Sequence, residues 1–218
     1  TLDIFASPNR PAHCKYGFFL LQTVSPMHNT INRPIIVTGG SAYADIDVLA
    51  CAIAYKELLS LLGFNAFAII TGPLNQTIPA SIRAWNLEIE RQFSLDSQQC
   101  DFVLVDLSDP KHMEKFVLLE NVVEVFDHHH GHEEFWKKRL FGNARIETIG
   151  ACATLIWEQF KAHHKGRKIS SQSANLLYTA IFANTLDFKS ALTTSRDIKA
   201  HEELLPHTKL PPDWKAQY

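Results

Sequence analysis

Three groups of acidic and histidine side chains follow short apolar runs in this sequence. Asp45 and Asp47 lie shortly after the run 35–37, and Asp106 directly follows the run 102–105. Residues 127–132, with the sequence Asp-His-His-His-Gly-His, follow the run 122–126. Carboxylate oxygens bind hard divalent cations, and neutral imidazole nitrogens bind borderline transition metals. The residue types therefore predict metal chemistry.

Each group alone has a simpler explanation. An Asp beside a helix start is commonly a cap, and Asp106 could serve only to form a turn. A histidine-rich loop can also be exposed, with incidental metal affinity. The spacing becomes informative when the apolar runs are taken as buried parallel strands, because their carboxyl ends meet at one edge of a sheet. Asp45, Asp47, Asp106 and His128 would then share one rim, and coincidence is the poorer explanation.

The rest of the chain supplies the elements that such a rim needs. Apolar patterning and turn residues predict strands at 35–37, 67–70, 102–105 and 122–126, and helices at about 44–62, 81–93, 111–120, 151–163, 171–184 and 195–204. This alternation predicts an α/β fold with a doubly wound, mainly parallel sheet and helices on both faces.

The predicted catalytic domain spans 34–204 of the 218 residues. Prolines and asparagines in 1–33 predict an irregular N-terminal extension, and the proline-rich segment 205–218 resembles a tail, or a linker to a C-terminal domain that is absent.

Composition excludes several classes of function. The formal net charge is −2, so no global positive field exists to hold a long nucleic acid. No apolar stretch approaches the roughly 20 residues of a membrane span. The four cysteines, Cys14, Cys51, Cys100 and Cys152, are far apart and form no C-x-x-C pair, which is typical of a reduced, cytoplasmic protein.

Four segments together resemble a known family. Segments 44–47 (Ala-Asp-Ile-Asp), 104–106 (Leu-Val-Asp), 126–129 (Phe-Asp-His-His) and 149–155 (Ile-Gly-Ala-Cys-Ala-Thr-Leu) resemble the DHH superfamily of phosphoesterases, over about 34–203. Segments 180–190 and 194–197 resemble its branch of manganese-dependent inorganic pyrophosphatases, exopolyphosphatases and prune-like proteins. The resemblance implies hydrolysis of a small phosphoanhydride, pyrophosphate or short polyphosphate, by a water activated by two ions of Mn²⁺, or of Mg²⁺ or Co²⁺.

The resemblance also implies roles for individual residues. Asp45 would bind one ion, Asp47 and His128 the other, and Asp106 would bridge both ions as part of the catalytic centre. His129 would face the substrate phosphate as the second catalytic residue.

Further phosphate contacts are less specific. His130 is a candidate that would hydrogen-bond the substrate, and Lys189 and Arg196 are candidate cations. Surface exposure is the simpler explanation for His130, and solvated surface charge is the simpler explanation for Arg196. For Lys189, a phosphate contact and a solvated surface charge are evenly matched.

Two positions depart from the family pattern. Ser41 stands where family pyrophosphatases usually carry a histidine. Asn184, a further candidate ligand, stands where an aspartate is expected and is a weaker donor for a hard cation. These departures leave open a catalytically impaired binding or regulatory module.

Two further functions are compatible with the sequence. A phosphodiesterase acting on short oligonucleotides or cyclic dinucleotides would need stacking aromatics in a neighbouring domain. An α/β domain without metal would use its acidic strand ends only to cap helices. Assembly into a homodimer is also left open.

Overall fold

The computed structural model describes residues 33–218. The predicted extension 1–33 therefore lies outside the described residues, apart from Arg33. The Arg33 side chain is tied to the start of the domain, because its Nε donates to Asp101 Oδ1 at 2.8 Å.

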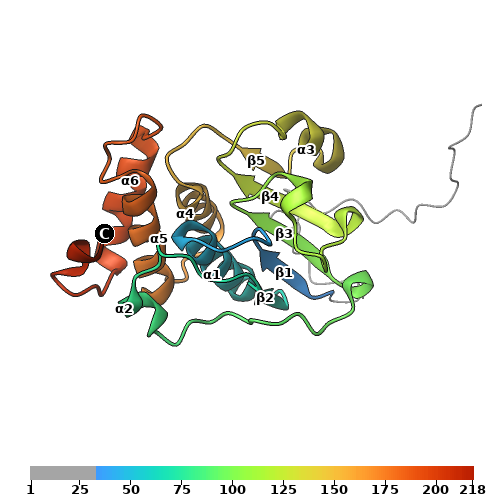
Figure 1. Ribbon diagram of the computed structural model, residues 1–218, viewed down its shortest axis with the longest axis horizontal. Coiled ribbons are helices and arrows are strands. Elements are labelled where there is room, and N and C mark those ends of the chain that lie inside the picture. The colour runs from blue at the N-terminus through green and yellow to red at the C-terminus, as the bar shows by residue number, and fades with distance from the viewer. Residues whose placement is uncertain (1–32) are drawn as a thin grey trace, which may run out of the picture.

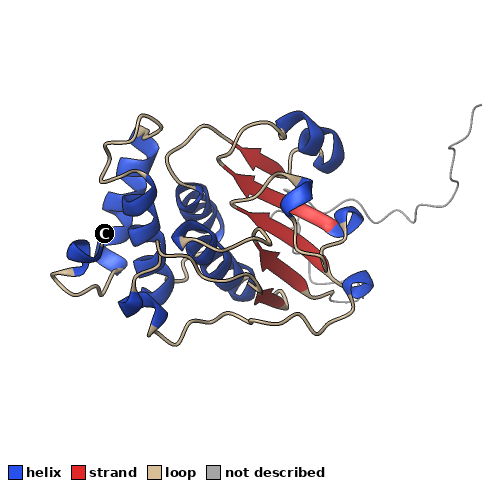
Figure 2. Cartoon of the chain, viewed as in Figure 1, coloured by secondary structure: helices blue, strands red, loops and turns tan. Residues whose placement is uncertain are grey.

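A five-stranded sheet forms the centre of the molecule (Figure 2). Its strands are β1 (Ile35–Thr38), β2 (Ala66–Ala68), β3 (Asp101–Val105), β4 (Val122–Asp127) and β5 (Ala144–Ile146). All pairs are parallel, and the spatial order is β2-β1-β3-β4-β5. The predicted parallel α/β fold is confirmed. The sequence patterns did not predict β5.

Two layers of helices cover one face of the sheet. Helices α1 (Ile46–Leu61) and α4 (Cys152–His163) lie between the sheet and the pair α5 (Ser171–Asn184) and α6 (Ser195–Leu204), as Figure 1 shows. Alternate residues of β1, β2 and β3, such as Val37 and Val103, join this core with Leu49 of α1. All four helices confirm the predictions from apolar spacing.

The other face has a smaller core under α3 (Glu133–Leu140). Trp136 of α3 is fully buried against the strand residues Phe102 and Leu104. Its indole Nε1 donates to Ser108 O at 2.6 Å, just beyond the end of β3. Helices thus lie on both faces, as predicted, although α3 itself was not predicted.

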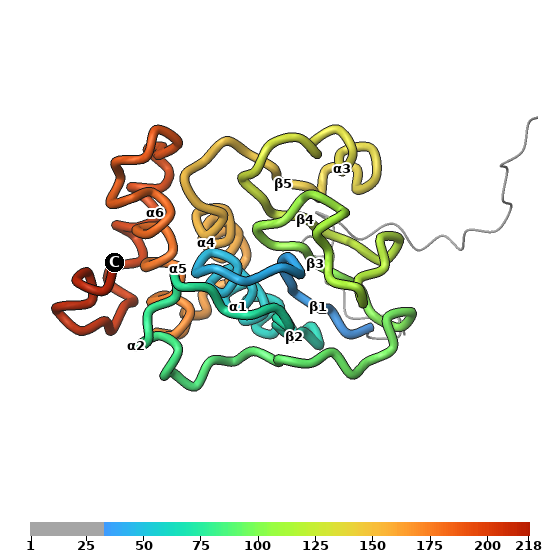
Figure 3. The backbone as a smooth tube through the Cα atoms, in the orientation of Figure 1, coloured from blue at the N-terminus to red at the C-terminus, as the bar shows by residue number. Residues whose placement is uncertain are grey.

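The predicted helix at 81–93 was wrong beyond its first turn. Only α2 (Ala80–Arg83) is helical, and the chain then runs along the edge of the sheet toward β3 (Figure 3). Trp85, Leu87 and Ile89 pack against the main core with a period of two, and Glu90 bridges Ile69 next to β2. Pairing with the edge strand outweighed the helical spacing.

The predicted helix at 111–120 was also wrong. The structure has only two short 3₁₀ turns, Pro110–His112 and Leu119–Asn121. Between them, Met113 forms a backbone bridge with Gly40, and Glu114 accepts a hydrogen bond from Thr71 Oγ1 at 2.5 Å. A continuous helix could not reach both partners.

The C-terminal segment packs against α5. It contains the 3₁₀ turns Leu205–His207 and Trp214–Gln217, and the Trp214 ring contacts Tyr178 and Phe182. Its role as a linker stays a prediction. Among residues 33–218, no helix has the length and apolarity to span a membrane.

Candidate metal centre

The candidate residues lie where the direction of the sheet changes. From β1 the chain passes to β2 on one side, whereas β3 pairs with the other side of β1. The carboxyl ends of strands at such a point are where α/β sheets bind ligands. Asp45 follows β1, Asp106 follows β3, and His128 follows β4.

Asp106 is the most unusual residue of this rim. Its φ of 54° is uncommon for a residue other than glycine, and its N–H continues the ladder by donating to Phe126 O at 2.8 Å. The side chain is 4% exposed, and Oδ1 is buried without a hydrogen bond. Burial, and then the charge of Asp47, raise the pKa of Asp106 to about 8. A nearby cation would relieve this cost.

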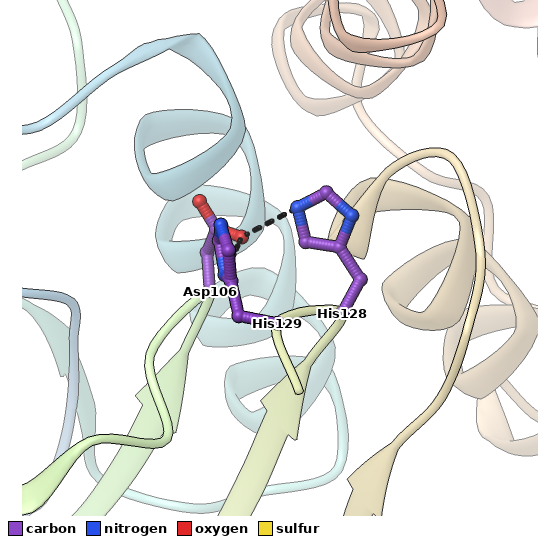
Figure 4. Close-up of side chains that lie close together, drawn as sticks. All are labelled: Asp106, His128 and His129. Carbon is purple, nitrogen blue, oxygen red and sulfur yellow. Dashed lines mark ion pairs between the residues drawn. The ribbon is translucent and has the colours of Figure 1, made fainter. Parts of the chain in front are cut away.

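Two histidines approach that carboxylate from β4. His128 Nε2 lies 3.2 Å from Asp106 Oδ1, and His129 Nδ1 lies 3.7 Å from the same atom (Figure 4). The three residues each offer one ligand atom, and these atoms all lie within 4.8 Å of one another. Such a spacing is compatible with a common metal ion.

His128 is held by its other nitrogen. Nδ1 lies 3.1 Å from Ile149 O, a bond in which the nitrogen must donate, so Nε2 faces Asp106. Burial opposes the charged ring, but the carboxylates of Asp106 and Asp47 outweigh it and raise the pKa of His128 to about 10. Nε2 is therefore the nitrogen that faces the acidic rim.

Asp127 shapes the loop after β4. It is fully buried, and its Oδ1 accepts the backbone N–H groups of His128 and His129 at 2.8 and 3.2 Å. The same oxygen lies 2.7 Å from His129 Nδ1. Burial opposes the charge of Asp127, but these hydrogen bonds prevail and lower its pKa, and the Asp127 contact raises the pKa of His129.

Asp47, in the first turn of α1, is hydrogen-bonded to the start of α4. Its oxygens accept the N–H groups of Cys152 and Ala153, both at 2.8 Å, and Oδ2 also accepts from Asn184 Nδ2 at 2.5 Å. His128 Nε2 lies 3.9 Å from Oδ2. Burial raises the pKa of Asp47 although the first turn of a helix favours an anion.

Asp45 is the N-cap of α1. Its Oδ1 accepts from the N–H groups of Asp47 and Val48, both at 3.0 Å. The simpler explanation, a helix cap, therefore holds for Asp45, and a metal role beside it stays a prediction.

The candidate phosphate contacts have other partners. His130 Nδ1 lies 3.0 Å from Glu133 Oε1, and Lys189 Nζ lies 3.2 Å from Asp187 Oδ2. Both side chains are exposed, at 60% and 77%, and neither belongs to the group of Asp106, His128 and His129. Their roles in substrate binding stay predictions.

Arg196 has two carboxylate partners. Its guanidinium pairs with Glu147 at 2.6 Å and with Glu158 at 2.7 Å. Arg196 is therefore a partly buried structural charge, rather than the solvated surface charge that was the simpler expectation from the sequence.

The contact between Gly150 and Asp197, which supports this centre, was not predicted from the sequence. Gly150 lies so close to its neighbours that a Cβ would be 2.7 Å from Thr185 Cγ2 and 3.0 Å from Asp197 Oδ2. Asp197 is fully buried, and Thr194 N and Thr154 Oγ1 both donate to it. The Thr194-x-x-Asp197 spacing resembles a capping box, but the contact with Gly150 joins segments 47 residues apart.

Comparison with known proteins agrees with this geometry. The family model described as "DHH family, N-terminal domain" matches residues 34–181. A probable manganese-dependent inorganic pyrophosphatase of Bacillus licheniformis is 31% identical over 166 residues, covering 76% of this chain and 52% of that protein. The manganese-dependent inorganic pyrophosphatase of Bacillus subtilis is 29% identical over 170 residues, covering 78% and 54%. The chain spans about half the length of the curated relatives it matches.

Solved structures show the same fold. A putative family II inorganic pyrophosphatase of Methanococcus jannaschii superposes with a TM-score of 0.62 and 22% identity, over 84% of this chain and 59% of that one. An exopolyphosphatase-related protein of Bacteroides fragilis gives 0.60 and 16%, over 81% and 53%. The family model covers more than half of the residues, including every strand and the Asp-His-His segment, and the chain therefore belongs to the DHH family.

Proposed function

We propose that this chain is the metal-binding domain of a manganese-dependent phosphohydrolase that cleaves pyrophosphate or a short polyphosphate. The observation that carries the proposal is Asp106 Oδ1, which is buried, accepts no hydrogen bond and lies 3.2 Å from His128 Nε2. The similarity to manganese-dependent inorganic pyrophosphatases supports the choice of metal and substrate.

The donor set suits hard or borderline divalent cations. Asp45, Asp47, Asp106 and His128 would hold two ions, with Asn184 as a neutral fifth donor, and Asp106 has two oxygens with which to serve both. When bound, such ions supply a water that ionises near neutral pH and positive charge for the phosphoryl oxygens.

His129 is suited to contact the substrate. Its ring is 64% exposed, and Asp127 holds Nδ1, which leaves Nε2 available to a phosphate oxygen. The Asp127 contact raises the pKa of His129, which favours the charged ring that could donate a proton to the departing phosphate. Asp127 acts through His129 and is a positioning residue.

A second candidate function rests on Asn184. Its amide donates to Asp47 Oδ2, so in this arrangement it satisfies the carboxylate without a cation. A domain that binds metal and phosphate weakly, and regulates rather than hydrolyses, would use the same fold.

Phosphate release distinguishes these functions. The full chain is incubated with Mn²⁺ and pyrophosphate, tripolyphosphate or a short dinucleotide, and compared with His129→Gln and the exposed control Lys115→Gln. We expect release from an anhydride, a kcat roughly 100-fold lower in His129→Gln and no change in the control. Products from the dinucleotide alone would indicate a phosphodiesterase. No turnover with Mn²⁺ bound would favour the regulatory module.

The thiols bear on the cellular setting. Cys51, Cys100 and Cys152 are buried and form no disulfide, which supports the proposal of a reducing, cytoplasmic location. Assembly into a homodimer stays a prediction.

A further inference from the structure

One peptide unit connects His128 to a buried carboxylate on α6. The carbonyl of Ile149 accepts from His128 Nδ1 at 3.1 Å. The N–H of Gly150, which belongs to the same peptide unit, donates to Asp197 Oδ2 at 3.0 Å. Because the C=O and N–H of a trans peptide point in opposite directions, the unit is held from both sides.

Asp197 itself is firmly fixed. It is fully buried, and Oδ2 also accepts from Thr194 N and Thr194 Oγ1, both at 2.8 Å. Oδ1 accepts from Thr154 Oγ1 of α4 at 2.7 Å. Only glycine fits at position 150 when Asp197 lies this close. A Cβ there would lie 3.0 Å from Asp197 Oδ2 and 2.7 Å from Thr185 Cγ2.

We propose that Asp197 is a positioning residue of the metal centre, which acts through the peptide 149–150 to keep the proton of His128 on Nδ1 and the lone pair of Nε2 directed at the cation. The inference rests on the proposed function, because it assumes that His128 is a ligand. Asp197 would contact neither the metal nor the substrate.

The physical argument concerns the tautomer. A histidine binds a metal only through an unprotonated nitrogen, and the hydrogen bond of the other nitrogen decides which one that is. Many metal sites place a carboxylate directly on the distal nitrogen of the ligand. Here a peptide lies between them, and the anionic acceptor at its N–H polarises the carbonyl toward His128.

A purely local role explains only part of the contacts. As part of the capping box of α6, Asp197 needs only its bond with Thr194. The bonds from Gly150 and Thr154 come from the start of α4, next to the candidate metal centre. These two contacts separate the proposed role from helix capping.

The test compares Asp197→Asn, Asp197→Ala and Thr194→Ala by Mn²⁺ titration of the full chain, with free Mn²⁺ followed by electron paramagnetic resonance. Asn keeps an oxygen for Gly150 and can donate to the Thr154 hydroxyl, so it removes the charge and preserves the shape. We expect the Kd for Mn²⁺ to rise about tenfold in Asp197→Asn and about 100-fold in Asp197→Ala. Thr194→Ala, which weakens the cap but leaves the Gly150 contact, should stay within about twofold of the parent.

A spectroscopic measurement accompanies the titration. In the ¹⁵N spectrum of the Mg²⁺-loaded protein, His128 should carry its proton on Nδ1 in the parent and lose this preference in Asp197→Ala. Circular dichroism shows which variants fold, and if Asp197→Ala does not, Asp197→Asn decides.

Two results would overturn the inference: parent-like Mn²⁺ affinity in the folded Asp197 variants, or an equal loss in Thr194→Ala. If the parent and variants show the expected order of Mn²⁺ affinity but the parent releases no phosphate, only the proposed function is contradicted.

Discussion

The side-chain amide of Asn184 donates a hydrogen bond of 2.5 Å to Oδ2 of the buried Asp47. A carboxylate at position 184 would instead lie next to the fully buried carboxylate of Asp47. Asn184 therefore stabilises the rim when no cation is present, and it removes one anionic donor when a cation binds.

Asn184→Asp should reverse this balance. Without metal we expect a loss of about 1–3 kcal/mol in the free energy of unfolding, from the repulsion with Asp47. With Mn²⁺, the added anionic donor should lower the Kd about tenfold, which is about 1.4 kcal/mol. Thermal unfolding in EDTA and in Mn²⁺ measures both effects.

The matched control for that variant is Asn175→Asp. Asn175 is another asparagine of α5. It is buried, and its Oδ1 accepts from Lys209 N, a bond that Asp preserves. It should not change the response to Mn²⁺. Equal Mn²⁺ affinity in Asn184→Asp and the parent would show that position 184 does not reach the metal.

The buried pair of Glu124 and Tyr55 predicts a pH dependence of stability. Glu124 on β4 accepts a hydrogen bond from the Tyr55 hydroxyl, and burial raises the pKa of Glu124 to about 7. Between about pH 4.5 and 7 the unfolded chain releases a proton that the folded protein retains, so stability falls as pH rises through this window.

Glu124→Gln removes the titrating group. We expect this variant to lack that fall and to be on the order of 1–3 kcal/mol more stable than the parent above pH 7. Urea unfolding at several pH values measures it, with the exposed Glu88→Gln as the control. If stability still falls by the same amount with rising pH in Glu124→Gln, another titrating group causes the fall.

Trp136 ties α3 to the loop after β3. In Trp136→Phe, the buried carbonyl of Ser108 loses its donor and the smaller ring leaves a void. We expect a loss of about 2–4 kcal/mol by urea unfolding. Phe135→Leu, on the same helix but 40% exposed, should change stability by less than about 1 kcal/mol. A similar loss in both variants would contradict this assignment.

A substitution of Arg196 tests whether its charge stabilises the fold or contacts the substrate. Arg196→Met removes the ion pairs with Glu147 and Glu158, which are partly exposed, and should cost about 1 kcal/mol. The KM for the hydrolysed phosphoanhydride should stay within about twofold of the parent. A KM that rises tenfold would mean that Arg196 contacts the substrate.

The sequence predicted the elements whose signals are local. Apolar patterns mark strands β1, β3 and β4 and helices α1, α4, α5 and α6, and side-chain caps begin α1, α5 and α6. The rim followed from these elements because strand ends in a parallel sheet must meet. Of the four residues expected on that rim, Asp106 and His128 lie close together in one group, which also includes His129.

The elements and contacts that the sequence did not predict depend on interactions between distant segments. Helix α3 is highly charged and is fixed by one buried tryptophan, which a periodicity argument overlooks. The segment after α2 has spacing compatible with a helix, but it pairs next to β2. The link from Gly150 to Asp197 joins the loop before α4 to the first turn of α6, and the sequence of neither segment predicts that the two meet.

The most direct test of the metal centre is Mn²⁺ binding to the parent, Asp106→Asn and the control Asp109→Asn, measured by electron paramagnetic resonance at neutral pH. Asp109 also follows β3 and lies 3.6 Å from His132 and 3.7 Å from His112, but it is outside the group of Asp106, His128 and His129. Asn preserves its role as the cap of a short turn. We predict that Asp106→Asn binds Mn²⁺ at least about tenfold more weakly than the parent, and that Asp109→Asn binds it equally. Equal binding by the parent and Asp106→Asn would contradict a metal centre built on Asp106.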